Sequence, residues 1–90
     1  MGLTGAGLVD ATDSQLAALK WLLNRNGDGA FAEKSNKSVL IAGGDRAPIM
    51  RGTWLRLEEL GLVERYMDGK RLRVTGAGRA TRLHHIDESR

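Results

Sequence analysis

The dipeptide Asp68-Gly69, which lies between two runs of strand-forming residues, is the sequence feature that most restricts the fold. An Asp-Gly pair at this spacing favours a two-residue turn between antiparallel strands, because the central positions of such a turn need positive φ angles. We therefore predict a β-hairpin over residues 62–75, with its register fixed by the turn. The predicted opposed pairs are Met67 and Lys70, Tyr66 and Arg71, Arg65 and Leu72, Glu64 and Arg73, and Val63 and Val74.

This register gives the hairpin two different faces, because opposed residues lie on the same side of a sheet. One face is apolar and carries Val63, Leu72, Val74 and Met67. The other face places Tyr66 beside Arg71 and Glu64 beside Arg73. We expect this second face to meet solvent or a ligand.

Helix signals lie before and after the hairpin. Thr12 and Gln15 have the spacing of a capping box, and leucines at helical spacing follow, so we predict a helix over residues 13–25. Thr75 is placed to cap a short last helix over residues 77–85.

A further helix is predicted over residues 46–60, with Asp45 as its N-cap and Pro48 in its first turn. At 100° per residue the sequence separates into two faces. The apolar face gathers Met50, Thr53, Leu57 and Leu60, with Ile49 and Trp54 at its edges and Trp54 expected in the core. The opposite face gathers Pro48, Arg51, Gly52 and Leu55.

Residues 28–44 allow two interpretations. We expect a turn at Asp28-Gly29 and a short strand in which Phe31 points inward. The apolar run over residues 39–41 fits a short second helix that is stopped by Gly43-Gly44. The same run fits a strand equally well.

Ninety residues provide for one small domain, and 41% hydrophobic residues suffice for a folded core. The absence of cysteine excludes disulfides, thiolate metal sites and cysteine nucleophiles. No apolar run reaches the ~18–20 residues that cross a bilayer, and no secretory signal is visible, so we expect a cytoplasmic protein without membrane contact. The expected organisation is a flexible arm over residues 1–11, one domain over 12–85 and a polar tail over 86–90.

Positive charge is concentrated in the second half of the chain. Residues 46–82 carry nine basic residues, of which eight are arginine, against four acidic residues, whereas residues 1–44 carry four of each. Arginine is the side chain best suited to phosphate groups and guanine edges. The balance favours a polyanion as the partner, provided that the arginines share one surface.

Two stretches carry a family resemblance: LEELGLVER over residues 57–65 and VTGAGR over residues 74–79. They resemble the end of the recognition helix and the wing of winged helix-turn-helix proteins, above all the multiple-antibiotic-resistance (MarR)-type regulators. The likeness covers roughly residues 46–80. It implies a mainly α fold with a small β-hairpin: a three-helix core, a wing and a short C-terminal helix. It also implies a small transcription regulator that binds double-stranded DNA sequence-specifically, with helix 46–60 in the major groove and wing 62–75 on the backbone.

The candidate DNA-binding residues lie on these two elements. Arg51 faces outward near the start of the helix and is placed to reach base edges, while Gly52 beside it permits close approach. Lys70 and Arg71 flank the hairpin tip, where they suit phosphates. Arg73 can instead pair with Glu64, and Arg71 can stack on Tyr66. The full set is Arg46, Arg51, Gly52, Leu55, Arg56, Lys70, Arg71 and Arg73.

Other functions fit the sequence less well. A module that docks a protein partner or a second copy of the chain, with Leu55 and Met67 as anchors, is the main alternative, and structured RNA is a further one. We expect no enzyme, because no nucleophile–base set or paired carboxylates stand out. No cofactor is expected, and His84-His85 lacks a third ligand for a metal.

Overall fold

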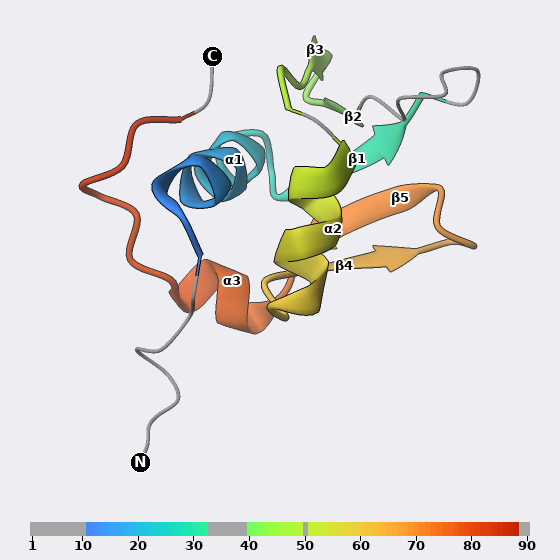
Figure 1. The fold of residues 1–90 in the computed structure, drawn as a ribbon. Helices are drawn as coiled ribbons and strands as arrows, with labels where there is room; N and C mark the ends of the chain where they lie inside the picture. The colour runs from blue at the N-terminus through green and yellow to red at the C-terminus, as the bar shows by residue number, and fades with distance from the viewer. Residues whose placement is uncertain (1–10, 33–39, 50, 89–90) are drawn as a thin grey trace.

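The computed structural model describes residues 11–32, 40–49 and 51–88. Within them the chain forms three helices and one antiparallel sheet of five strands, in the order β3-β2-β1-β5-β4 (Figure 1). The elements are α1 (Asp13–Leu23), β1 (Asp28–Phe31), β2 (Leu40–Ala42), β3 (Asp45–Arg46), α2 (Arg51–Glu59), β4 (Val63–Tyr66), β5 (Arg71–Val74) and α3 (Gly76–Ala80). The arm expected over residues 1–11 falls, apart from Ala11, outside the described residues.

The predicted fold class, a mainly α winged helix-turn-helix, is wrong: the chain is a small α+β protein. The hairpin β4–β5 is not an isolated wing, because β1 pairs with β5 and brings β2 and β3 into the same sheet. The interpretation of residues 39–41 as a helix also fails where it can be checked, since Leu40–Ala42 is a strand. Gly43 and Gly44 have φ angles of 59° and 83°, which turn the chain back into β3 instead of ending a helix.

The start of α2 also differs from the prediction. The helix was expected over residues 46–60 but begins at Arg51, since Asp45 and Arg46 pair with β2. Ala47 extends this pairing by donating its N–H to the Leu40 carbonyl at 2.7 Å. Pro48 disfavours helical backbone in the residue before it, which opposes a helix that begins at Arg46. The predicted core position of Met50 lies outside the described residues.

The elements expected from the strongest local signals are confirmed. Thr12 and Gln15 form the capping box of α1, which ends at Leu23. The strands β4 and β5 have the predicted register from Val63 opposite Val74 to Tyr66 opposite Arg71. Met67, expected on the apolar face, lies instead in the turn and is 64% exposed.

The segment after α1 forms its turn earlier than expected. Asn26 and Gly27 take positive φ angles of 72° and 69°, and the Gly27 carbonyl accepts the N–H of Val74 at 2.8 Å. The chain therefore enters β1 at Asp28, where we expected a turn.

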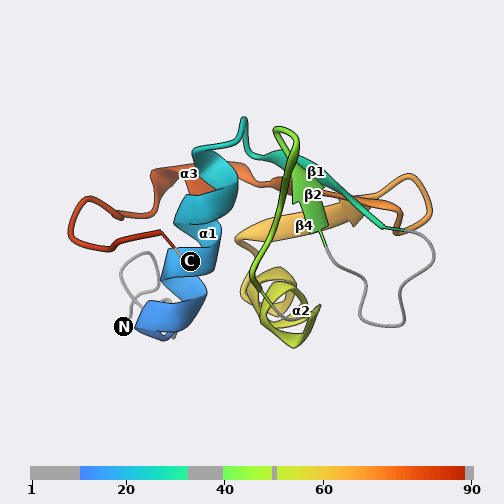
Figure 2. The same ribbon diagram turned by 90° about the horizontal axis from the view of Figure 1, so that it is seen from above.

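The sheet has one covered face and one open face, and both α1 and α2 pack on the same side (Figure 2). The strand register places Gly29 opposite Leu72 on the covered face, and Asp28 opposite Arg73 on the open face. Between the covered face and the helices lies the core, which includes Trp54 as predicted. Its largest fully buried side chains are Trp54, Leu19, Leu22, Leu40, Leu57, Leu62, Leu72 and Val63.

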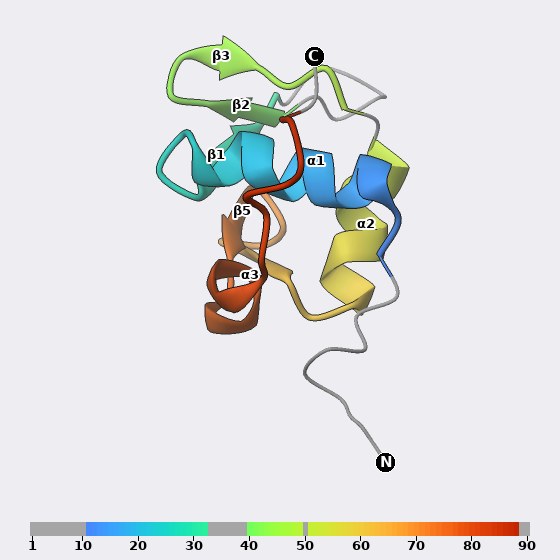
Figure 3. The same ribbon diagram turned by 90° about the vertical axis from the view of Figure 1, so that its left-hand side faces the viewer.

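The C-terminal segment packs against α1 instead of extending the last helix. We predicted a helix over residues 77–85 and a polar tail after it, but α3 ends at Ala80 and Ile86 is buried. Lys20 donates from Nζ to the carbonyl oxygens of Leu83 and Ile86, at 3.1 and 2.5 Å. Figure 3 shows this segment running beside α1. Burial of Leu83 and Ile86 favours this path over a continuation of the helix.

Candidate nucleic-acid interface

The solvent side of α2 carries a row of side chains that recur at helical spacing. Arg51, Gly52 and Arg56 are exposed, and Leu55 is half-buried. The predicted outward orientation is therefore confirmed for Arg51 and Gly52, whereas Leu55 is only partly exposed. Arg56 lies 3.5 Å from Glu59, one turn further along the helix. The first turn of α2 contains no acidic residue, so no carboxylate of that turn offsets the charge of Arg51.

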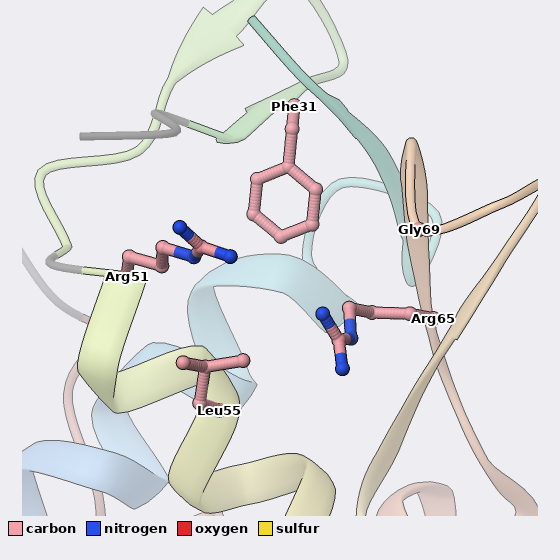
Figure 4. Close-up of a pocket in the computed structure, with 5 residues that line it drawn as sticks. All are labelled: Phe31, Arg51, Leu55, Arg65 and Gly69. Carbon is pink, nitrogen blue, oxygen red and sulfur yellow. The ribbon is translucent and has the colours of Figure 1, made fainter. Parts of the chain in front are cut away.

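A small pocket lies between the N-terminal half of α2 and the sheet (Figure 4). Its volume is about 60 Å³, which leaves room for a group of a few heavy atoms. Arg51 and Arg65 extend toward one another from opposite sides of this space, with the Phe31 ring above the gap and Leu55 below it in this view. The lining residues are Phe31 of β1, Arg51 and Leu55 of α2, Arg65 of β4, and Gly69 of the hairpin turn.

Arg65 is held in the pocket by Glu58 of α2. Its Nε donates to both carboxylate oxygens, each at 3.0 Å, and its backbone N–H donates to Oε2 at 3.3 Å. The hydrogen bond from the Arg65 side chain is the main reason that the pKa of Glu58 lies below its usual value, so Glu58 is ionised at neutral pH. The two terminal amino groups of Arg65 have no hydrogen-bond acceptor within the described residues.

Arg51 approaches the same pocket from the first turn of α2. It is exposed and makes no ion pair or hydrogen bond within the described part of the chain. No acidic side chain lines the pocket. Two guanidinium groups are therefore balanced by the single carboxylate of Glu58, which leaves the site with a net positive charge.

Two of the predicted hairpin residues lie on the open face of the sheet, away from this pocket. Arg71 donates from Nε to the Tyr66 hydroxyl at 2.9 Å and from Nη2 to Asp28 at 3.2 Å. Arg73 donates to Glu64 at 2.6 Å and lies 4.6 Å from the centre of the Tyr66 ring. The expected Arg73–Glu64 pair is confirmed.

These contacts use the charge of both arginines within the protein. The expected stacking of Arg71 on Tyr66 is also confirmed, at 5.9 Å from the ring centre. The pKa of each arginine is raised, mainly by a side-chain hydrogen bond: to Tyr66 for Arg71, and to Glu64 for Arg73. Both guanidinium groups are thus partnered before any ligand approaches.

The structure therefore separates the candidate residues into groups. Arg51 and Leu55 meet at the pocket, while Gly52 and Arg56 share the solvent side of α2. Lys70 is exposed in the turn beside the pocket residue Gly69. Arg46 belongs to β3 opposite Ile41, not to the entrance of a helix as predicted.

Three pocket residues, Arg65, Phe31 and Gly69, were absent from the predicted site. The hairpin register contained a signal for Arg65, because it placed this charged side chain opposite the buried Leu72 on the apolar face. An arginine in such a position needs a polar partner or an opening to solvent. Phe31 was expected to point inward, but its place beside Arg65 depends on the pairing of β1 with β5.

No protein-family model, curated protein or solved structure matches this chain. Among the described residues, no helix has the length and apolar character to cross a membrane. The same residues bring together no group of three His, Asp or Glu side chains that could hold a metal ion. His84 and His85 lie edge to face, with ring centres 5.4 Å apart.

Proposed function

We propose that the protein binds double-stranded DNA in the cytoplasm, as a small transcription regulator, through α2 and the adjoining hairpin turn. The observation that carries this proposal is the convergence of Arg51 and Arg65 on one pocket beside the exposed N-terminal half of α2. Neutralisation of phosphates by such side chains supplies most of the affinity in protein–DNA binding.

The shape and charge of α2 support a groove-binding role. An α-helix with its side chains is roughly 10–12 Å across, which matches a major groove about 12 Å wide. Gly52 presents no side chain on the exposed surface, so a DNA strand can approach the backbone there. Both acidic residues of α2 lie in its last turn, where Glu58 pairs with Arg65 and Glu59 with Arg56.

The contrast between the two faces of the sheet also supports α2 and the hairpin turn as the DNA-binding surface. On the open face, Arg71 and Arg73 already have acidic partners in Asp28 and Glu64. Beside the pocket, Arg51 and Lys70 have none within the described residues. DNA would therefore gain more charge neutralisation at α2 and the turn than on the open face.

The test is binding of a labelled 20-base-pair duplex to the full chain, followed by fluorescence anisotropy over a range of salt concentrations. We expect log K to fall linearly with log salt, by about 0.9 for each phosphate neutralised. Lys70→Gln, beside the pocket, should weaken binding. Arg82→Gln is the matched control, because it removes the same charge from an exposed position beyond α3.

One observation favours a second function. Met67 is 64% exposed at the hairpin tip, and Leu55 is accessible in the pocket, so both anchors of the protein-docking alternative are available. A protein dock through these apolar side chains would change little with salt. Absence of duplex binding, together with a salt-insensitive protein complex that Met67→Ser abolishes, would replace the DNA proposal. Preferential competition by duplex RNA would favour RNA as the ligand.

A further inference from the structure

We propose that the pocket between α2 and β4 binds one phosphodiester group of the DNA backbone, clamped between Arg51 and Arg65. This inference rests on the proposed function and deepens it, because it names the chemical group that the site takes. It also assigns Arg51 to the DNA backbone, whereas its helix position alone suggested contact with bases.

The hydrogen bonds of Arg65 prepare it for such a ligand. Glu58 occupies Nε through both of its oxygens, which fixes the plane of the guanidinium group. The terminal amino groups are left free of acceptors within the described residues and extend into the pocket. A guanidinium group presents its donors in a rigid planar fork that matches two oxygens of a phosphate. Glu58 is therefore a positioning residue that orders Arg65 before the ligand binds.

The charge of the site selects among phosphates. Arg51 and Arg65 contribute two positive charges, and Glu58 contributes one negative charge, while the remaining lining residues are neutral. A net charge of one positive unit balances a phosphodiester, which carries a single negative charge. A phosphate monoester carries close to two negative charges at neutral pH. A phosphodiester therefore neutralises the lining of the pocket, whereas a phosphate monoester leaves excess negative charge there.

The size and apolar walls of the pocket agree with this ligand. About 60 Å³ has room for a phosphate group. Phe31 and Leu55 border the gap between the two arginines from either side, where they can contact the carbon atoms of the adjoining deoxyribose. The strand would then pass along the pocket, with α2 on one side and the hairpin turn on the other.

The arginine test compares salt slopes for the 20-base-pair duplex. Arg51→Gln and Arg65→Gln should each weaken binding about three- to tenfold. If both arginines clamp one phosphate, the double variant should reduce the slope by about 0.9, whereas contacts to two separate phosphates would reduce it by about 1.8. Arg73→Gln, on the open face of the same hairpin, is the control and should leave affinity and slope unchanged.

The positioning role of Glu58 can be tested by the change in DNA affinity when Glu58 is replaced, because simple electrostatics predicts a change of the opposite sign. Glu58→Ala removes a negative charge, so charge alone would strengthen DNA binding. If Glu58 orders Arg65, the variant should instead bind several-fold more weakly. Glu64→Ala removes the same charge next to Arg73 and should leave binding unchanged or slightly stronger. Tighter binding by Glu58→Ala would overturn the positioning role.

Side-chain NMR distinguishes the possible sources of the phosphate. The Nε–Hε signals of Arg51 and Arg65 should shift with the duplex and more strongly with dimethyl phosphate than with inorganic phosphate. A stronger response to inorganic phosphate would overturn the choice of a phosphodiester. A duplex that binds the wild-type chain, but binds Arg51→Gln and Arg65→Gln with unchanged affinity, would overturn the clamp and leave DNA binding intact. A wild-type chain that binds no duplex at any salt concentration would overturn both.

Discussion

The carboxylate of Glu58, in the last turn of α2, accepts hydrogen bonds from Arg65 of β4 through both of its oxygens at 3.0 Å. The last turn of a helix disfavours acidic residues, because the helix dipole places partial negative charge there. The pairing with Arg65 offsets this cost and ties the C-terminal end of α2 to the sheet. It also orients the side chain that lines the pocket, so one contact links the fold to the candidate site.

This contact predicts a pH-dependent contribution to stability. The pKa of Glu58 in the folded protein lies below its usual value of 4.5, mainly because Arg65 donates a side-chain hydrogen bond. The stabilisation is therefore fully present above pH 4.5 and is lost as pH falls through the lower folded-state pKa. We expect Glu58→Gln to lower the free energy of unfolding, measured in urea at pH 7, by about 0.2–1 kcal/mol. The effect is small because the pair is partly exposed. The two proteins should converge at pH 2, and a constant difference would contradict the assignment.

The facing of α2 predicts the effect of truncating its core residue. Leu57 is fully buried, so Leu57→Ala should lower the free energy of unfolding by roughly 2–5 kcal/mol. Leu55 lies two residues earlier and is half-buried, so Leu55→Ala should lower the free energy of unfolding by clearly less. Urea unfolding followed by circular dichroism measures both variants. Equal losses would mean that α2 presents a different face to the core.

A pair of glycines in α3 predicts opposite responses to the same substitution. A Cβ atom at Gly78 would lie 2.1 Å from the backbone oxygen of Leu62, whereas Gly76 has open space around it. Gly78→Ala should therefore destabilise the fold by at least about 1–3 kcal/mol, the usual cost of an overpacked core. Gly76→Ala should be neutral or stabilise by up to about 1 kcal/mol through helix propensity. Thermal unfolding of the two variants provides the comparison, and similar midpoints would contradict the packing of α3 on Leu62.

The link between Lys20 and the C-terminal segment predicts a local effect. Lys20→Met retains most of the side-chain volume but removes the donor to the carbonyls of Leu83 and Ile86. We expect faster amide hydrogen exchange at Ile86, whose N–H donates to the Leu83 carbonyl at 2.9 Å, with little change at Leu72 in β5, which is paired on both sides. Uniformly faster exchange would indicate global destabilisation instead.

Local signals predicted the parts of the fold that depend on neighbouring residues. The Asp68-Gly69 pair gave the register of β4 and β5, and Thr12 with Gln15 gave the start of α1. The apolar run over residues 39–41 was left open, because a short apolar run followed by two glycines fits a helix end and a hairpin equally well, and Asp45 and Arg46 were wrongly assigned to the start of a helix. Pairing with β1 selects the strand for Leu40–Ala42. Pro48 opposes helix in the residue before it, and α2 begins at Arg51.

The candidate site shows the same division between local and distant information. Arg51 was placed on the exposed side of α2 by helical period alone. Phe31 enters the pocket beside Arg65 because β1 pairs with β5, a contact between distant parts of the chain. Arg71 and Arg73 stood out as a basic pair in the sequence, yet the partner of Arg71 is Asp28 of β1, which the hairpin alone does not contain.

The pairing of residues 28–30 with residues 71–73 also has a kinetic and thermodynamic consequence. Closing so long a loop costs entropy before any contact across it repays the cost, so β1 should join the sheet late in folding. Phe31 reaches Arg65 only through that step, and the pocket is therefore assembled only in the complete native state. A ligand in the pocket binds the native state and not its precursors, so each gain in occupancy shifts the folding equilibrium toward the native protein.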